Sequence, residues 1–479
     1  MPASLTSPAL AENSTSRLLQ RVGLALGGVL ALAFAIVMPP LQIPDEDGHF
    51  VRAYLISRGE FVGRGAPRLP APIVAFVMRY PEDGENFEKF SPRALMRDLT
   101  SRPENMQEAG PPLANRDGRH KWLAWSTISS SLYCPIVYLP ASLGILTAQT
   151  FGASPLLMMY CARILNAFVF IAALAVSFRL APAYRGLVTV IALMPMTLHQ
   201  AGGISADVVT IALSFIGVGL VLYGRQHLIT RRFLILVALV FVSWSLSKSS
   251  IWALPLLALL PMSGFRSRLN WLAYIGAVSG CMVGALLIWN GITSHNMDAF
   301  RAIRLTQGID ISANVRLVIA HPLSFAGHLL GMMLVNLKLE VGQFIGAFGW
   351  TKFNLPLWAK SLYLLLILLV AAMERSPKPF RIWERGVLVL VFVAGVVFVH
   401  AAMAVSDTTL CGGTLRSLCA DLYTGVQGRY LIPFCLAGLL ALRQTRITLP
   451  QVTVLRVVMA VGTLHALASL ALILSTYYL

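Results

Sequence analysis

The chain has 479 residues, of which 57% are hydrophobic and 12% are charged, whereas a soluble globular domain typically carries about 25% charged residues. So few charged side chains do not cover the surface of a soluble protein of this length, and a mean hydropathy of +0.71 agrees that lipid surrounds most of the chain. The formal net charge of +17 would suggest a nucleic-acid partner in a soluble protein, but the basic residues lie in short loops between apolar runs, so we expect no nucleic-acid partner.

Thirteen apolar runs follow one another along the chain, and roughly 20 apolar residues let a helix cross a bilayer core about 30 Å thick. The runs lie at 20–38, 131–149, 158–178, 185–199, 204–223, 232–247, 250–262, 270–290, 322–345, 356–373, 385–405, 428–442 and 453–477. The positive-inside rule places the basic loops in the cytoplasm, which requires that 131–149 and 322–345 do not cross. The first is broken by two prolines and the second carries several polar side chains, so we expect amphipathic or re-entrant helices at the outer side.

The sequence therefore predicts an all-α integral protein of the inner (cytoplasmic) membrane, with about 11 (10–13) transmembrane helices, a cytoplasmic N-terminus and an external C-terminus. Its expected parts are an N-terminal tail with the first transmembrane helix (1–39), a large external loop with juxtamembrane or re-entrant helices (40–157), a transmembrane bundle (158–290), an external loop with an amphipathic or re-entrant helix (291–355), and C-terminal transmembrane helices (356–479) with an external loop at 406–426. Residues 40–130 hold 12 of the chain's 21 acids, and we expect short amphipathic helices there, the first at 46–58.

Two of the six cysteines, Cys411 and Cys419, share one polar loop. If that loop lies outside, a disulfide between them suits the oxidising compartment, and two reduced thiols are the alternative. The other four cysteines lie in or beside apolar segments, where a thiol behaves as a small hydrophobic group. The sequence leaves the pairing open.

With the topology set by loop charge alone, an unusual set of polar residues falls at the outer side. It comprises Asp45, Glu46, Asp47 and His49 after the first crossing helix, Arg163 and Asn166 in the outer half of another, Asp207 and Lys248 at outer turns, and Gln427, Arg429 and Tyr430 at the start of a late helix. Ionisable groups within or beside a membrane are costly and usually face a cavity. Three cations and two or three carboxylates around one external cavity predict an anionic lipid headgroup as the substrate.

Each member of this set also has a purely structural explanation. Acids near Asp45 are suited to cap a helix N-terminus, and Asp207 is suited to cap the helix that follows it. Arg163 can extend its charge to the lipid headgroups, and Lys248 and Arg429 can anchor the chain at the membrane interface. The convergence of these residues on one side, rather than any single member, favours a functional site.

Seven motifs, in order, resemble the DUF2142 family of bacterial membrane proteins. They are Pro44–Phe50 (PDEDGHF) with Arg52, Ala53 and Tyr54, Tyr133–Pro140 (YCPIVYLP), Arg163 with Asn166, Leu193–Asp207 (LMPMTLHQAGGISAD), Leu246–Lys248, Gly349–Trp358 (GWTKFNLPLW) and Gly425–Pro433 (GVQGRYLIP). That family in turn resembles the GT-C glycosyltransferases, in which two external loops each carry a catalytic acid. Asp45 and Glu46 in the first loop and Asp207 in the second agree with this layout. Family members often have an acid after the Trp of the late Gly-Trp motif, where this chain has Thr351 and Lys352, so no acid role carries over there.

The GT-C resemblance implies transfer of a sugar from a polyprenyl-phosphate-linked donor to an envelope glycan or lipid acceptor, with inversion at the anomeric carbon. Asp45 is then the expected base for the acceptor hydroxyl, and Glu46 or Asp207 would orient it or share a divalent cation, Mg²⁺ or Mn²⁺. The expected ligands of the lipid phosphate and the donor are Arg163, Lys248, Arg429, Tyr430, Gln427, Asn166 and His49.

Metal dependence stays open at this stage, because Asp45, Glu46 and Asp47 are candidate ligands without a diagnostic spacing. The main alternative function is a transporter or flippase for a lipid-linked or anionic solute, which predicts inverted repeats and charges near the membrane midplane. No repeat is evident in the sequence, and the charges lie near one face. A non-enzymatic factor in polysaccharide assembly is a further alternative.

Overall fold

The computed structural model describes residues 14–63, 67–80, 90–102, 106, 110, 119–375, 378–407, 425–444 and 446–479. Within these residues the chain is mostly helical, with one short antiparallel pair formed by β1 (Ala347–Phe348) and β2 (Phe353–Asn354). Cys411 and Cys419, whose pairing the sequence leaves open, lie outside the described residues. The expected all-α membrane protein is thus confirmed at the level of fold class.

Among the described residues, seven helices are long and apolar enough to cross a membrane. They are α1 (Ser14–Val37), α7 (Pro155–Leu180), α10 (Ala206–Gly224), α12 (Arg268–Ile292), α15 (Pro322–Gly346), α17 (Ile382–Asp407) and α19 (Gln451–Tyr477). Shorter members of the bundle are α8 (Arg185–Ala192), α9 (Pro195–Ala201), α11 (Arg231–Leu246), the 3₁₀ helix η4 (Ile251–Leu259), α16 (Leu357–Met373), the 3₁₀ turn η7 (Gly428–Leu431) and α18 (Ile432–Ala441). The count of eleven crossing helices stays a prediction.

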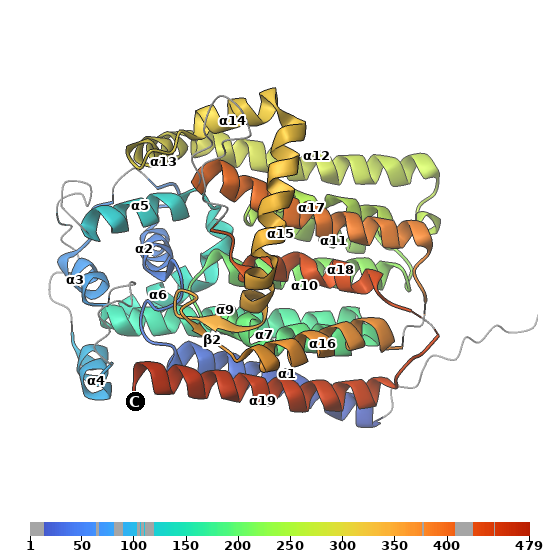
Figure 1. The fold of residues 1–479 in the computed structure, drawn as a ribbon, viewed down its shortest axis with the longest axis horizontal. Coiled ribbons are helices and arrows are strands. Elements are labelled where there is room, and N and C mark those ends of the chain that lie inside the picture. Colours follow the sequence, from blue (N-terminus) through green and yellow to red (C-terminus); the bar gives the residue numbers. More distant parts are fainter. Residues whose placement is uncertain are drawn as a thin grey trace, which may run out of the picture.

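The long helices run side by side, and further short elements gather at one end of the bundle (Figure 1). These are α2 (Glu46–Ser57), α3 (Ala71–Arg79), α4 (Pro92–Thr100), α5 (Arg119–Ser131), η2 (Pro135–Val137), α6 (Leu139–Thr150), α13 (Ser294–Thr306) and α14 (Ile311–Ala320). The connections from α10 to α11, from α16 to α17 and from α18 to α19, which are rich in arginine, lie at the opposite end. The basic loops therefore share one end of the molecule, and α2 to α6 lie at the other.

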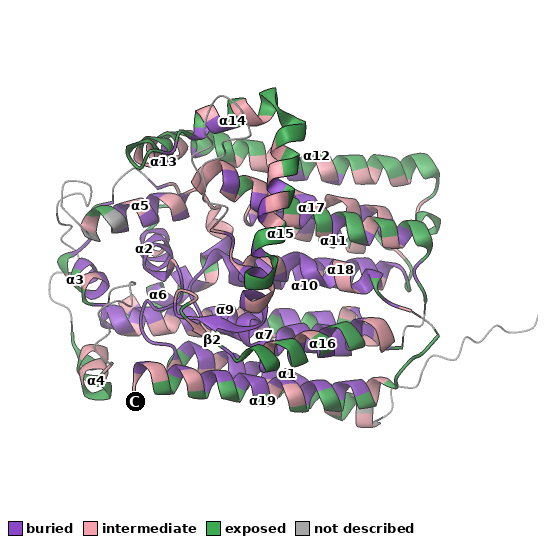
Figure 2. Cartoon of the chain, in the orientation of Figure 1, coloured by how far each residue is buried: buried purple, intermediate pink, exposed green. Residues whose placement is uncertain are grey.

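The outer helices present apolar side chains on their exposed faces, which is the pattern of a lipid-facing surface. Figure 2 shows long exposed stretches on α12, α11 and α17. Only 11% of the apolar window of α12 is buried, and Leu269, Leu287 and Ile288 of this helix are 65–73% exposed. A water-soluble protein would not expose so apolar a helix, so the fold supports a multi-pass membrane protein.

Several predicted runs form a different element from the single crossing helix expected. The run 185–199 divides into α8 and α9, because Pro195 at the first position of α9 holds the preceding Met194 in an extended conformation. The run 250–262 forms η4, a 3₁₀ helix with Pro255 inside it. Proline inside a helix cannot donate the main-chain hydrogen bond that an uninterrupted α-helix needs, which accounts for the second departure.

The two runs expected not to cross differ from one another. The run 131–149 begins in the last residue of α5 and continues through η2 into the 12-residue α6, which is shorter than the roughly 20 residues that a crossing helix needs. Gly144 lets α6 lie directly on α7, because a Cβ there would be 2.5 Å from the carbonyl oxygen of Cys161. The other run forms α15, which has the length and hydropathy of a crossing helix but is steeply inclined to its neighbours in Figure 1.

Candidate functional site

Four charged side chains from distant parts of the sequence meet near the start of α2. Asp45 precedes α2, Asp207 lies in the first turn of α10, Lys248 lies between α11 and η4, and Arg429 belongs to η7. Arg429 Nη2 donates to Asp45 Oδ2 at 2.7 Å, and Arg429 Nε lies 3.6 Å from Asp207 Oδ2. Lys248 Nζ forms an ion pair with Asp207 Oδ1. These four residues, called the ion cluster below, balance two carboxylates with two cations.

The ion cluster has a buried side and a side open to solvent. The side chains of Asp207 and Arg429 are 2% and 3% exposed, whereas those of Lys248 and Asp45 are 19% and 34% exposed. Asp45 and Lys248 also have positive φ angles of 64° and 48°, as does Ser249 at 52°. Side chains other than glycine adopt this conformation rarely, and such backbone strain gathers at functional sites. The two accessible members of the cluster are thus the two held in unusual conformations.

Two tyrosines flank the cations of the cluster. Lys248 Nζ lies 4.6 Å from the ring centre of Tyr430 and 5.8 Å from that of Tyr133. Arg429 Cζ lies 5.1 Å from the Tyr430 ring, and Arg429 Nη2 donates to the Tyr430 hydroxyl at 3.3 Å. Aromatic faces attract cations and offer an apolar surface with a polar hydroxyl at its edge. This combination suits a ligand with both anionic and apolar parts.

His49 lies on α2 beside the ion cluster. Its Nδ1 is 2.7 Å from the hydroxyl of Tyr138, and its ring centre is 6.2 Å from that of Tyr133. Burial is the largest influence on the pKa of His49, and Lys248 and Arg429 act in the same direction while Asp45 and Asp207 oppose it; together they lower this pKa to about 4. His49 is therefore a neutral imidazole at physiological pH, suited to hydrogen bonding rather than to balancing a phosphate charge.

A second ion pair, between Arg163 on α7 and Glu46 on α2, is fully buried. Arg163 Nε donates to Glu46 Oε1 at 2.8 Å, and Nη2 donates to Glu46 Oε2. The remaining donors bond to carbonyl oxygens at the end of α1, those of Ala35, Met38 and Pro39. A guanidinium has five N–H groups, and all five are used here. Arg163 thus has no free donor for a lipid phosphate in this conformation, and the predicted phosphate-binding role does not fit its position.

The pair between Glu46 and Arg163 is tied to the loop that precedes α10. Glu46 Oε1 accepts a hydrogen bond from the Ile204 main-chain nitrogen at 3.1 Å. Asn166, one turn beyond Arg163, donates from Nδ2 to the carbonyl oxygen of Gly203 at 2.8 Å. Glu46 and Asn166 therefore hold the backbone next to Asp207, rather than contacting the ion cluster themselves. Both were predicted as site residues, and both act here as positioning residues.

The three acids of the first motif point to different partners. Asp45 pairs with Arg429 and Glu46 with Arg163, while Asp47 Oδ1 accepts from the Ser126 hydroxyl of α5 at 3.0 Å. Within the described ranges, no group of three His, Cys, Asp or Glu side chains lies close enough to hold a metal ion. The donor set that the sequence suggested for Mg²⁺ or Mn²⁺ is therefore not assembled among the described residues.

Gln427 and Gly428 shape the inner wall of the site. A small hollow of about 10 Å³ lies beside Pro44, Gln200, Gln427 and Arg429, enough for about one water molecule. The Gln427 side-chain oxygen is buried without a partner among the described residues. Gly428 lies against α15, where a Cβ would approach the Glu340 carbonyl oxygen to 2.2 Å. This close contact sets the position of Arg429, the next residue along the chain.

Tyr133 and Tyr138 are site residues to which sequence reasoning gave no role. Both belong to the motif Tyr133–Pro140, but a tyrosine beside an apolar run is the ordinary pattern of a membrane interface. The prolines of that motif were the available signal, because they interrupt the run and place Tyr133 between α5 and η2. Burial raises the pKa of both tyrosines, so they remain protonated donors.

Comparison with known proteins gives one result, at the level of family. Residues 29–437 match the family described as predicted membrane protein (DUF2142), so the chain belongs to this family. The match contains α2, the ion cluster and the pair between Glu46 and Arg163. No curated protein and no solved structure matches the chain.

Proposed function

We propose that this member of the DUF2142 family is a membrane glycosyltransferase of the GT-C type. It transfers a sugar from a polyprenyl-phosphate-linked donor to an envelope glycan or lipid acceptor at the external face, with inversion at the anomeric carbon. The observation that carries the proposal is the ion cluster, in which Asp45 and Lys248 are accessible while Asp207 and Arg429 hold them from the buried side. An accessible carboxylate beside two cations fits a reaction that removes a proton and releases a phosphate.

Asp45 is the base in this proposal. Its Oδ2 bonds to Arg429, while Oδ1 accepts no hydrogen bond from the described residues and is available to the acceptor hydroxyl. As the acceptor oxygen bonds to the anomeric carbon, its proton passes to Asp45, and the bond from that carbon to the phosphate oxygen breaks. The electron pair leaves with the polyprenyl phosphate.

Lys248 and Arg429 stabilise the departing phosphate. Both ammonium and guanidinium groups form strong, charge-assisted hydrogen bonds with phosphate oxygens, and Lys248 is the more accessible of the two. Asp207 forms ion pairs with both cations and so fixes their separation. Tyr430 and Tyr133 offer hydroxyl groups and ring faces to the sugar. In this arrangement Asp207 is a positioning residue, whereas the sequence had suggested a catalytic acid.

The isoprenoid chain of the donor requires an apolar groove open to lipid. A hollow of about 290 Å³ lies between α15 and α16, lined by apolar residues together with Lys338 and Lys360. It involves Gly342 and Ile345, in the same part of α15 whose Gln343 accepts a hydrogen bond from the Gly428 main-chain nitrogen. We assign the isoprenoid chain to this hollow, which neighbours the segment that carries Arg429.

One observation favours the second candidate, a transporter or flippase. Glu340 of α15 and His400 of α17 form a buried pair, with His400 Nε2 at 3.1 Å from both carboxylate oxygens of Glu340. Buried ionisable groups in membrane-spanning helices often belong to ion or solute pathways. A transporter that uses this pair would lose transport in Glu340→Gln, whereas Asp45→Asn would leave the solute bound and moved.

The test is deletion of the gene in its native bacterium, followed by mass spectrometry of envelope glycans and of polyprenyl-linked sugars. A glycosyltransferase predicts loss of one defined sugar from a glycan or lipid, together with accumulation of its polyprenyl-phosphate donor on the outer side. A flippase predicts that the lipid-linked sugar stays inside, protected from a periplasmic glycosidase. Unchanged glycans and lipid-linked sugars would contradict the glycosyltransferase proposal.

A further inference from the structure

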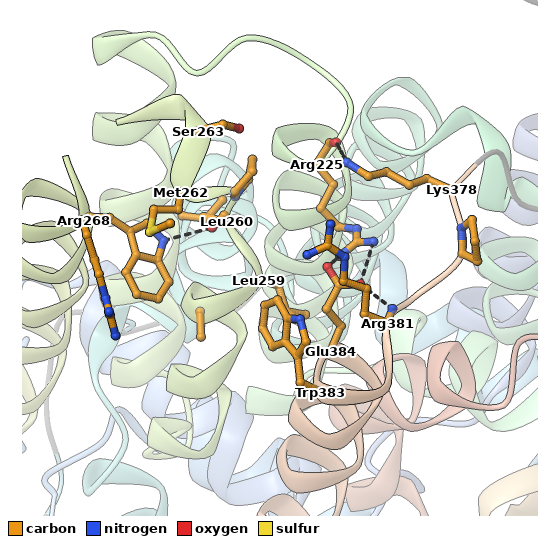
Figure 3. Close-up of a pocket in the computed structure, with 14 residues that line it drawn as sticks. Arg225, Leu259, Leu260, Met262, Ser263, Arg268, Lys378, Arg381, Trp383 and Glu384 are labelled. Atoms are coloured by element: carbon orange, nitrogen blue, oxygen red, sulfur yellow. Dashed lines mark hydrogen bonds and ion pairs between the residues drawn. The ribbon is translucent and has the colours of Figure 1, made fainter. Parts of the chain in front are cut away.

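A second polar site lies at the end of the bundle opposite the ion cluster. It is a hollow of about 510 Å³ between the end of α10, the segment from η4 to α12, and the start of α17 (Figure 3). Its 14 lining residues include four basic side chains, those of Arg225, Arg268, Lys378 and Arg381, and one acid, Glu384. The hollow is therefore strongly positive and lies at the end where the basic loops gather.

The single acid of this hollow is already paired. Arg225 bonds to Glu384 through both Nη atoms, with Nη2 3.1 Å from Oε2, and its guanidinium lies 4.4 Å from the ring centre of Phe380. The main-chain nitrogen of Arg381 also donates to Glu384 Oε2 at 2.7 Å, and Lys378 Nζ donates to the carbonyl oxygen of Arg225 at 3.1 Å. Both carboxylate oxygens of Glu384 therefore already accept hydrogen bonds from protein groups.

Arg268 and Arg381 have guanidinium groups available to a ligand. Both residues are exposed, and neither side chain donates a hydrogen bond within the part of the chain that the structure describes. Figure 3 shows Arg268 and Arg381 on opposite sides of the hollow, with Trp383 between them. Two free guanidinium groups facing one hollow suit a phosphate, which each can bind through paired hydrogen bonds.

The rim of the hollow is apolar and faces lipid. Trp383 and Met262 are about half exposed, and the neighbouring Leu269 and Ile382 are 73% and 86% exposed. Trp271 is anchored through its Nε1, which donates to the carbonyl oxygen of Leu260 at 2.9 Å. Tryptophan beside arginine at a helix end is typical of the level of the lipid headgroups. A water-soluble anion would gain nothing from this rim, whereas acyl chains would cover it.

We propose that this hollow is a specific binding site for the phosphate headgroup of an anionic membrane lipid, held by Arg268 and Arg381. The acyl chains lie over Leu269 and Ile382, and the headgroup joins α10, α12 and α17 at this end of the bundle. Basic pockets between membrane helices are known to select anionic headgroups in this way. The site is independent of the sugar-transfer proposal, because it lies at the other end of α10 from Asp207.

The experiment uses the full chain purified in detergent, stripped of lipid, and examined by native mass spectrometry and by thermal stability. Phosphatidylglycerol is compared with phosphatidylethanolamine of the same acyl chains, and glycerol 3-phosphate is the soluble arm. The variants are Arg268→Gln, Arg381→Gln and the double variant. Arg266→Gln is the matched control, since Arg266 is exposed on the same loop but does not line the hollow.

The proposal predicts one tightly retained phosphatidylglycerol per chain and a higher melting temperature with this lipid than with phosphatidylethanolamine. The double variant should bind it at least about tenfold more weakly, as expected for the loss of charge-assisted hydrogen bonds, and Arg266→Gln should match the wild type. Equal retention by the double variant would overturn the proposal. An equal loss of lipid binding in Arg266→Gln would indicate a general attraction of the lipid to basic loops. Binding of glycerol 3-phosphate as strong as that of the lipid would indicate a site for a soluble anion. Either result contradicts a specific lipid site.

Discussion

Replacing Arg163 by glutamine separates the structural role of this residue from a role in binding phosphate. The change removes two bonds to Glu46 and three to the carbonyl oxygens of Ala35, Met38 and Pro39, and it leaves the Glu46 carboxylate buried without its cation. Breaking a buried ion pair by removing one partner typically costs about 3–5 kcal/mol, because the remaining charge is uncompensated. We expect a loss of that order in the free energy of unfolding.

The assay is reversible unfolding in mixed detergent micelles with increasing SDS, for the wild type, Arg163→Gln, Glu46→Gln and the double variant. The single variants should each be strongly destabilised, and the double variant should be less destabilised than the sum of the two, because it buries no unpaired charge. An exposed ion pair contributes about 1 kcal/mol or less. The reasoning would be refuted if Arg163→Gln lost sugar transfer while its free energy of unfolding stayed within about 1 kcal/mol of the wild type. That result would make Arg163 a ligand of the donor phosphate.

Two further predictions concern His49 and Gly428. The pKa of His49 is about 4 in the folded chain and 6.5 in the unfolded chain, so the unfolded chain takes up the proton first as pH falls. The free energy of unfolding should therefore be highest above pH 6.5 and decline by up to about 3 kcal/mol towards pH 4. His49→Gln should flatten this slope in unfolding titrations, and an unchanged slope would contradict the assignment. Gly428→Ala should displace η7 from α15 and lower sugar transfer in cell envelopes more than Gly276→Ala, whose Cβ would meet open space. Equal activity of the two alanine variants would show that this close contact does not position Arg429.

The end of the molecule at which the site lies was predictable from the sequence. The outer ends of the predicted apolar runs carry, or lie beside, four charged residues, and loop charge alone sets which side is outer; these residues are Asp45, Asp207, Lys248 and Arg429. The structure brings these four residues into contact, although no pattern in the sequence specifies which carboxylate meets which cation. The pairing of Asp45 with Arg429 joins positions separated by 384 residues, and it depends on how α2 and η7 pack.

The role of Arg163 was not predictable, for a physical reason. An arginine in the outer half of a membrane helix looks the same in sequence whether it reaches the headgroups, a ligand or a buried carboxylate. The position of Arg163 depends on the last turn of α1 and the two residues after it, because the carbonyl oxygens of Ala35, Met38 and Pro39 accept three of its five hydrogen bonds. The broken run at 185–199 differs, because Pro195 was visible in the sequence and its effect on Met194 follows from proline geometry.

The central claim, that Asp45 is the base of an external sugar transfer, is tested most directly in the deletion strain restored with Asp45→Asn. Asp298→Asn is the matched control, since this carboxylate lies on α13, near the same end, and its side chain is 73% exposed. At equal membrane abundance, mass spectrometry should find the sugar missing from the envelope and its polyprenyl-phosphate donor accumulated in the Asp45→Asn strain, with both normal in the control. Full restoration of the sugar by Asp45→Asn would contradict the account.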